Sequence, residues 1–208
     1  MKITILTDNP NSWILPFVEQ LKVKLNNYTI QHVFSHNEIK KGDIMLILSC
    51  ENIISEQILS LHKNNIVVHP SDLPKGKGWS PLAWQVLEGK DNIPITLFEA
   101  SNEVDAGKIY IKDVIHLDGT ELNEEIKLKQ GLKTVEMICE YINGHYTSAV
   151  SQNGESTFYP KRTAIDSELD INKTIGEQFN LLRIVDNERY PAFIKINNKK
   201  YFIKIYNE

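Results

Sequence analysis

One uninterrupted apolar run, Ile44-Met45-Leu46-Ile47-Leu48, constrains the fold of this chain more than any other stretch. It is far too short to cross a membrane. A strand with one face in water would alternate apolar and polar residues, whereas a wholly apolar strand is typical of a parallel sheet that helices cover on both faces. We therefore predict that residues 43–48 form a central strand of an α/β sheet.

Segments of strand and helix character alternate on either side of this run. Further strands are predicted at 2–7, 28–34, 66–68, 93–99 and 108–115, and helices at 13–26, 55–63, 82–88 and 121–143. This order predicts a Rossmann-like core. The turn after the first strand, Asp8-Asn9-Pro10-Asn11, contains no glycine, so a dinucleotide is not expected to bind there.

The composition changes after residue 147. Residues 148–157 are rich in Ser, Gln, Asn, Gly and Glu and are predicted to be a linker. A helix at 171–184 follows, and then strands at 192–196 and 201–205 flank the turn Asn197-Asn198-Lys199-Lys200. The predicted fold class is α/β, with a Rossmann-like core at 1–147. Residues 148–208 are expected to form a linker and a small C-terminal helix-plus-β-hairpin subdomain.

Charges and cysteines argue against several classes of protein. Lys and Arg number 23 against 27 Asp and Glu, which gives a net charge of −4, and no long basic run stands out. Nucleic acid is therefore not an expected partner. The first strand begins at Lys2, which leaves no room for a signal peptide. Cys50 and Cys139 have no metal or redox spacing. We expect a cytoplasmic protein with reduced thiols and neither a metal nor a membrane partner.

The strand at 66–68 runs into a loop of unusual composition, HPSDLPKGKGWSP. Proline stiffens such a loop, and glycine permits backbone geometry that other residues avoid. In open α/β sheets, ligands bind in the crevice beyond the carboxyl ends of the strands. His69 lies at the junction of strand and loop and is therefore a candidate active-site residue.

A second candidate, Asp105, lies in the polar turn between the strands at 93–99 and 108–115. Taken alone, a single histidine is more often structural, and an aspartate near a glycine is more often a turn residue. On adjacent loops, however, an imidazole and a carboxylate are suited to proton transfer during attack on a carbonyl.

Two interpretations stay open for the segment Lys75-Gly76-Lys77-Gly78. It is either a solvated loop or an anion site, in which ammonium and backbone N–H groups approach a phosphate or a carboxylate. The same holds for Trp79, which can belong to the core or a lid, or can stack on a ligand ring.

Together, the two motifs resemble those of the 10-formyltetrahydrofolate-dependent formyltransferases. HPSDLPKGKGWSP is similar to the histidine–SLLP–glycine loop of this family, and VDAGKI is similar to its Asp-x-Gly segment. The C-terminal stretch YPKRTAIDSELDINKTIGEQFNLLRIVDNERYPAF is similar to the segment that follows the core in the sugar N-formyltransferases, a branch related to methionyl-tRNA formyltransferase. The similarity covers residues 40–208.

This resemblance implies N-formyl transfer from 10-formyltetrahydrofolate at the strand ends of a Rossmann-like catalytic core. His69 and Asp105 match the catalytic histidine and aspartate of the family. His69 would orient or protonate the developing oxyanion, and Asp105 would take the proton of the attacking amine or tune the imidazole. The segment that resembles the cofactor loop, expected to hold the pterin through backbone groups, comprises Ser49, Cys50, Glu51, Asn52, Ile53 and Ile54.

One position departs from the pattern of the family. Its asparagine two residues before the histidine is replaced by Val67. Either another amide, such as Asn52, Asn65 or Asn102, holds the formyl oxygen, or the activity is weakened or lost.

The expected acceptor is an amino sugar or an aminated sugar nucleotide, of the kind used in surface glycan biosynthesis. A transfer RNA is disfavoured because the chain is net acidic and nucleic-acid binding depends on cation–phosphate contacts. The candidate acceptor contacts are Lys75, Lys77, Gly78, Trp79, Arg183, Arg189 and Tyr190. Two alternatives remain, a folate- or nucleotide-binding module without full activity and a formyltransferase for a small phosphorylated amine. A homodimer, common among similar sugar enzymes, also stays open.

Overall fold

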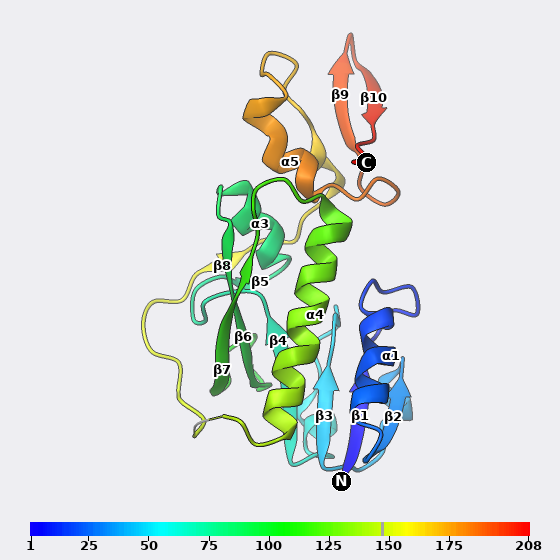
Figure 1. Cartoon of the computed structure of the whole chain (residues 1–208), viewed down its shortest axis with the longest axis vertical. Coiled ribbons are helices and arrows are strands. Elements are labelled where there is room, and N and C mark those ends of the chain that lie inside the picture. The colour runs from blue at the N-terminus through cyan, green and yellow to red at the C-terminus, as the bar shows by residue number, and fades with distance from the viewer. Residues whose placement is uncertain (147) are drawn as a thin grey trace.

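Six strands form one sheet in the computed structural model, which describes residues 1–146 and 148–208. In sheet order they are β2 (Thr29–Val33), β1 (Lys2–Leu6), β3 (Ile44–Ile47), β4 (Asn64–His69), β6 (Asn92–Glu99) and β7 (Ile109–His116) (Figure 1). The first four are parallel, and β6 and β7 continue the sheet in antiparallel fashion. The carboxyl ends of β1, β3 and β4 therefore meet at one edge of the sheet.

The apolar run at 44–48 occupies the centre of this sheet, as its composition predicts. Ile44 and Leu46 belong to one buried cluster, and Met45 and Ile47 belong to another. Helices α1 (Leu15–Lys24), α3 (Pro81–Leu87) and α4 (Asn123–Ile142) contribute to the first cluster, and the short helix α2 (Glu56–Leu59) contributes to the second. Since full burial of one such aliphatic side chain stabilises a fold by about 1.5–3 kcal/mol, the run anchors both layers.

The C-terminal residues form a small unit at one end of the molecule (Figure 1). It comprises the 3-10 turns η2 (Ala164–Ser167) and η3 (Gly176–Gln178), helix α5 (Phe179–Ile184), and a hairpin of β9 (Ala192–Ile196) and β10 (Lys199–Ile203). Leu169, Leu182, Val185 and Ala192 form a buried cluster within it. Helix α5 also packs against α3 and α4, so the unit is attached to the core.

Two predictions for this unit are wrong in detail. The helix predicted at 171–184 is helical only from η3 onward, because Ile171 and Ile175 are 58% and 72% exposed and have no core to face. The hairpin turn is also shorter than predicted, since β10 already begins at Lys199. Asn197 and Asn198 both have positive φ, 47° and 62°, which suits a tight two-residue turn.

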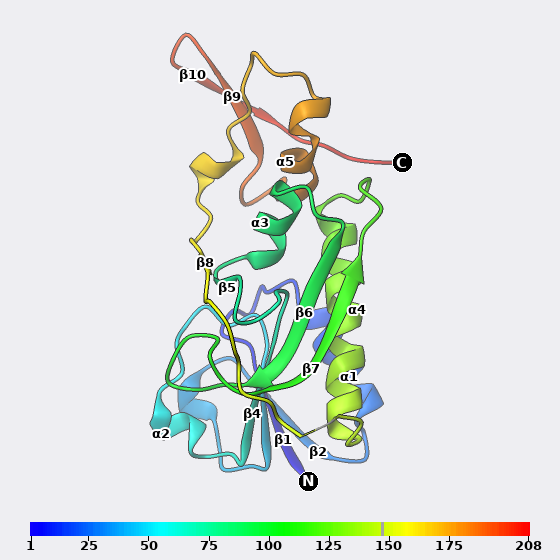
Figure 2. The same cartoon turned by 90° about the vertical axis from the view of Figure 1, so that its left-hand side faces the viewer.

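A short pair of strands joins distant parts of the chain. β5 (Lys77–Gly78), within the loop that follows β4, pairs in parallel with β8 (Phe158–Tyr159). Figure 2 shows the yellow segment that contains β8 running past β5 on its way to the C-terminal unit. Neither strand was predicted, because two-residue strands leave no periodicity in a sequence.

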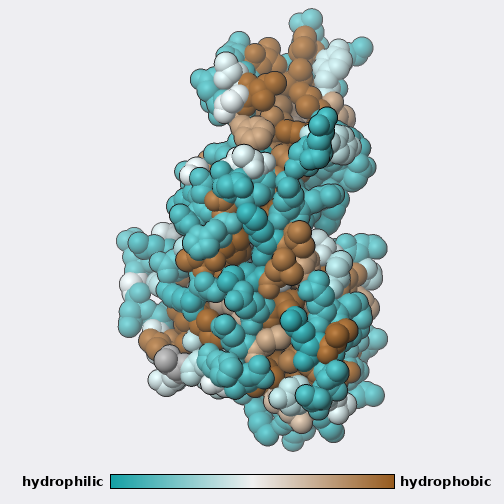
Figure 3. Space-filling model, in the orientation of Figure 1, coloured by the Kyte–Doolittle hydropathy of each residue, from teal (hydrophilic) through white to brown (hydrophobic). Residues whose placement is uncertain are grey.

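The surface in Figure 3 is mostly hydrophilic, with hydrophobic patches that include the C-terminal unit at the top. Exposed side chains of that unit include Ile175, Phe202 and Tyr206. Within 1–146 and 148–208, no helix is both long and apolar enough to cross a membrane.

Candidate active site

A cleft of about 560 Å³ opens beyond the carboxyl ends of the parallel strands. Its walls come mainly from residues 47–54 after β3, 67–70 at the end of β4, 78–83 before and within α3, and 100–105 after β6. The cleft therefore lies where the fold class predicts a ligand site.

His69 and Asp105 converge in this cleft. The Nε2 atom of His69 lies 3.8 Å from Oδ2 of Asp105 and 2.9 Å from the carbonyl oxygen of Gly76. Because a carbonyl oxygen can only accept, Nε2 carries the hydrogen, and Nδ1 is the acceptor of the neutral ring. Oδ2 of Asp105 accepts a hydrogen bond from the Gly78 N–H at 2.9 Å. Both candidate side chains are thus oriented by backbone groups of the loop that follows β4.

The turn that carries Asp105 is held by a close backbone approach. Asp105 has a positive φ of 49°, and two residues later a Cβ on Gly107 would lie 1.6 Å from the carbonyl oxygen of Glu99. Only glycine fits there without moving the end of β6. The glycine of the VDAGKI motif therefore fixes the path of the loop that presents Asp105.

We expect Gly107→Ala to lower the midpoint of thermal unfolding by about 2–12 °C and also to lower turnover. The added methyl group must displace backbone, and overpacking of this kind costs about 1–3 kcal/mol or more. Circular dichroism on heating measures the shift. Gly176→Ala is the matched control, because no heavy atom lies within 4 Å of a Cβ built there. Equal melting temperatures for the two variants would contradict the close approach.

All six residues of the expected cofactor loop line the cleft, namely Ser49, Cys50, Glu51, Asn52, Ile53 and Ile54. The loop is organised by Asp8, which the sequence prediction missed. Its Oδ2 accepts hydrogen bonds from the backbone N–H of Glu51 at 2.7 Å, the backbone N–H of Asn52 at 2.8 Å and the Asn52 amide at 2.8 Å. The sequence did carry a signal for Asp8, because a carboxylate directly after the first strand must lie at the carboxyl edge of the sheet.

Cys50 contributes a thiol to the cleft, but not a nucleophile. Burial, together with the nearby Asp8 charge, raises the pKa of Cys50 to about 12. The thiol is also within 3.4 Å of the Leu6 carbonyl oxygen, to which it donates. Because the thiolate is the reactive form, this cysteine is inert at neutral pH.

The predicted acceptor contacts divide into two groups. Gly78, Trp79, Arg189 and Tyr190 line the cleft, whereas Lys75, Lys77 and Arg183 do not.

Neither lysine of the loop lines the cleft. Lys77 is buried, its backbone pairs with β8, and its Nζ lies 5.8 Å from the centre of the Phe158 ring. Lys75 is exposed outside the cleft. The expectation that Lys75 and Lys77 together form an anion site is therefore wrong. The pairing of β5 with β8 turns this loop toward β8 and not toward the cleft.

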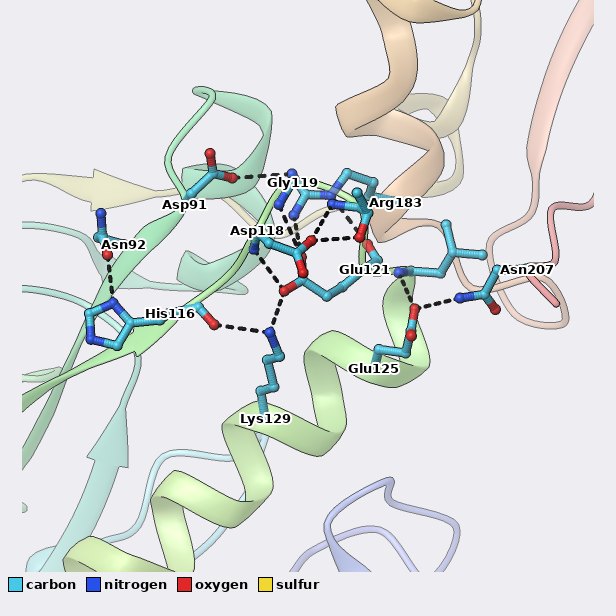
Figure 4. A network of polar contacts seen from close by, with 12 residues as sticks. Asp91, Asn92, His116, Asp118, Gly119, Glu121, Glu125, Lys129, Arg183 and Asn207 are labelled. Atoms are coloured by element: carbon cyan, nitrogen blue, oxygen red, sulfur yellow. Dashed lines mark hydrogen bonds and ion pairs between the residues drawn. The ribbon is translucent and has the colours of Figure 1, made fainter.

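Arg183 is a structural residue, which corrects its expected role. It is 1% exposed, and its Nη2 lies 3.1 Å from Oε2 of Glu121 while its Nη1 lies 3.5 Å from Oδ1 of Asp91 (Figure 4). Its Nε donates to the Glu121 carbonyl oxygen at 3.2 Å. A guanidinium that is buried and paired in this way joins α5 to the β7–α4 connection and is not available to a substrate.

Other cations, which the sequence prediction missed, line the cleft instead. Lys161 lies 3.0 Å from Glu51 and 4.2 Å from the centre of the Trp79 ring, and Lys127 lies 3.2 Å from Asp186. Arg162 also lines the cleft, and burial lowers the pKa of its guanidinium. The local sequence carried no signal for them, because they reach the cleft from α4 and from the chain beyond residue 160.

Three asparagines were considered as replacements for the asparagine that the family has at the position of Val67, and the structure places them differently. Asn65 does not line the cleft, and its amide donates to the Leu59 carbonyl oxygen at 3.1 Å. Asn52 lines the cleft, but its amide is bound to Asp8. Asn102 lines the cleft on the loop of Asp105, and within the described residues its side chain makes no hydrogen bond.

Curated relatives match the chain at about a quarter identity. Methionyl-tRNA formyltransferase of Thermotoga neapolitana is 26% identical over 163 residues, which are 76% of this chain and 52% of that protein. The enzyme of the same name from Mycoplasma capricolum is 26% identical over 176 residues, which are 81% and 55% of the two chains. The chain thus spans about half the length of these relatives.

Solved structures share the fold along the whole chain. Methionyl-tRNA formyltransferase from Clostridium thermocellum superposes with a TM-score of 0.84 at 23% identity and covers 99% of this chain and 92% of its own. A 4-N formyltransferase from Francisella tularensis superposes with a TM-score of 0.70 at 18% identity and covers 100% and 98%. These likenesses confirm the predicted Rossmann-like fold.

The sequence profile described as "Formyl transferase" matches residues 14–141, which is more than half of the chain. That range contains the loop after β4, the turn of Asp105 and most of the cleft wall. The chain therefore belongs to the formyl transferase family, as its two motifs predict.

Proposed function

We propose that this chain transfers a formyl group from 10-formyltetrahydrofolate to an amine of an amino sugar or an aminated sugar nucleotide. The observation that carries this proposal is the convergence of His69 and Asp105, 3.8 Å apart, in a cleft that the expected folate loop also lines. Family membership supports formyl transfer as the reaction class.

The cleft suits a flat heterocycle with a polar edge. Its volume of about 560 Å³ lies within the range of small-molecule sites. Ile47, Ile54, Val67 and Phe98 supply apolar walls, and loop 49–54 supplies backbone donors and acceptors. The folate donor would supply the formyl carbon, and the residues of this chain would orient it and move the protons.

In this proposal Asp105 moves the proton and His69 stabilises the oxyanion. The carboxylate would take a proton from the attacking amine and pass it to the departing nitrogen of tetrahydrofolate as the bond from that nitrogen to the formyl carbon breaks. The Gly78 N–H holds Oδ2 of Asp105, whereas within the described residues Oδ1 makes no hydrogen bond and is free to accept a proton from the attacking amine. The Nε2–H of His69 donates to the Gly76 carbonyl oxygen and lies beside this carboxylate; in the proposed reaction the formyl oxygen would share this hydrogen, which would stabilise the negative charge that develops there. A carboxylate base next to an imidazole donor is suited to acyl transfer to an amine.

Asn102 is our candidate for the amide that the family has at the position of Val67. We expect Asn102→Ala to lower the turnover number about 100-fold while the melting temperature stays unchanged, because one oxyanion donor contributes about this factor. Steady-state kinetics measures the loss. Asn37→Ala, an exposed asparagine outside the cleft, is the control. Wild-type turnover in Asn102→Ala would rule out this role.

Charge and shape of the cleft support an acceptor with an acidic group and a ring. Arg189 lines it with a positive charge, whereas Lys161 is already paired with Glu51, and Trp79 and Tyr190 contribute aromatic rings. The net charge of −4 disfavours a large polyanion. A methionyl-tRNA acceptor is a second candidate, because the curated relatives carry that activity in their names.

A transfer assay tests the function directly. The protein is incubated with 10-formyltetrahydrofolate and, in parallel, with amino sugars, aminated sugar nucleotides, small phosphorylated amines and methionyl-tRNA. Turnover on a sugar acceptor supports the proposal. Turnover only on methionyl-tRNA, or only on a phosphorylated amine, would refute the sugar acceptor and assign that substrate instead. Folate binding with no turnover on any acceptor would identify a binding module and refute the catalytic proposal.

A further inference from the structure

The segment predicted as a linker lies against both catalytic loops. Residues 152–159, here called the clasp, follow the path of the yellow segment beside β5 in Figure 2. Two kinds of contact connect the clasp to the candidate active site, one through the loop of His69 and one through the turn of Asp105.

The first contact leads to His69 through a single residue. The Gly76 N–H donates to Oγ1 of Thr157 at 2.9 Å, and the Gly76 carbonyl oxygen accepts from Nε2 of His69 at 2.9 Å. The hydroxyl of Thr157 thus fixes the residue whose carbonyl sets the tautomer of the imidazole. Thr157 lies 81 residues from Gly76 in the sequence.

The second contact leads to Asp105. The Lys77 N–H donates to the Thr157 carbonyl oxygen at 2.9 Å, and the Trp79 N–H donates to that of Tyr159 at 3.1 Å. Between them, the Gly78 N–H is left to hold Oδ2 of Asp105.

Gly78 is pressed closely against the clasp. Its φ is +92°, and a Cβ there would lie 2.6 Å from the Tyr159 carbonyl oxygen. The N–H that holds Asp105 therefore has little freedom to turn away.

A side chain of the clasp also holds the turn of Asp105 directly. Nε2 of Gln152 donates to the carbonyl oxygens of Asp105 and Gly107, both at 2.9 Å. Two acceptors on either side of Ala106 pin the turn in which Asp105 adopts its positive φ. The clasp therefore contacts the backbone that orients each member of the pair, without lining the cleft itself.

We propose that the clasp aligns the His69–Asp105 pair, with Thr157 and Gln152 as positioning residues. The inference rests on the proposed function in that it takes the pair to be catalytic. Thr157 holds the residue whose carbonyl oxygen accepts the Nε2–H of His69, which keeps this nitrogen protonated at 3.8 Å from Asp105, and Gln152 holds the turn that presents the carboxylate.

Kinetics on the full chain tests the positioning role. Thr157→Val keeps the shape of the side chain but removes the acceptor for the Gly76 N–H, whereas Thr157→Ser keeps the acceptor. We expect Thr157→Val to lower kcat about 10-fold with KM for 10-formyltetrahydrofolate within about twofold, and Thr157→Ser to restore at least half of the rate. Unchanged kcat in Thr157→Val, or an equal loss in Thr157→Ser, would overturn the proposal.

A second measurement does not depend on turnover. Nitrogen-15 NMR of the imidazole distinguishes Nε2–H from Nδ1–H, and His69→Gln identifies the signals of this ring. We expect the Nε2–H form in the wild type and a mixture of tautomers in Thr157→Val. An unchanged tautomer in that variant refutes the clasp, whatever the activity. The two proposals can also fail separately. If the wild type transfers no formyl group but Thr157→Val still changes the tautomer of His69, the proposed function is refuted and the positioning role of the clasp is supported.

Discussion

Replacing His69 by alanine is expected to lower the rate of formyl transfer by about a thousandfold, within the range of about 10²–10⁴ typical of a positioned acid–base group. The variant loses the Nε2–H that lies beside Asp105. The fold should survive, because the only hydrogen bond of the ring within the described residues goes to the Gly76 carbonyl. Single-turnover kinetics with 10-formyltetrahydrofolate and the preferred acceptor measures the loss.

Asp105→Asn separates charge from shape at the same site. An asparagine side chain can still accept the Gly78 N–H through its oxygen, but it cannot take a proton from an amine. A loss of about a hundredfold or more is expected, with little change in melting temperature. His116→Ala is the control, since His116 also ends a strand but lies outside the cleft. Near-wild-type turnover in either active-site variant would remove the proposed roles.

The largest effect on stability is expected at Arg183. Arg183→Met should lower the free energy of unfolding by about 2–4 kcal/mol, because it removes the buried hydrogen bonds of the guanidinium to Glu121 and one of the two cations paired with that carboxylate. Glu121, 3.1 Å from the guanidinium and 4% exposed, then keeps Lys129 as its remaining cationic partner. Denaturant unfolding followed by fluorescence measures the change. For turnover of the protein that remains folded we expect little loss, since Arg183 does not line the cleft.

A double variant isolates the buried pair. Arg183→Met combined with Glu121→Leu should recover much of the loss, because apolar replacement of a whole buried ion pair is often neutral. Lys195→Met breaks an exposed pair, 2.7 Å from Glu168, and is the control with an expected effect below about 1 kcal/mol. An Arg183→Met variant as stable as Lys195→Met would contradict the interpretation.

The same network predicts how stability depends on pH. Burial alone would raise the pKa of Glu121, but the Lys129 ammonium and the Asp118 N–H outweigh burial and lower it (Figure 4). A carboxyl whose pKa is lower in the folded state stabilises the fold above its unfolded value of about 4.3. This contribution is lost as the pH falls through the folded value. Melting temperatures measured at decreasing pH should therefore fall less steeply for Glu121→Gln than for the wild type.

The sequence by itself determined the central strand, the alternation around it and the two candidate catalytic residues. Each of these depends on short-range information. An apolar run of five residues has few ways to be buried, and His69 at a strand end must lie at the edge where the loops meet. Asp105 lies in a turn that the glycine two residues later marks, and the resemblance of VDAGKI to the Asp-x-Gly segment of the family singled it out as catalytic.

Only the tertiary structure decided which of the other side chains face the cleft. Arg183 was expected to bind a ligand but is buried against Glu121, 62 residues earlier, and the segment predicted as a linker instead holds Gly76, 81 residues earlier. Asp8 orders a loop 44 residues later. Local patterns record the propensity of a segment and the face it buries, whereas these contacts depend on where distant segments meet. Which distant segments come into contact is decided by the packing of the whole chain, and no single stretch of the sequence specifies it.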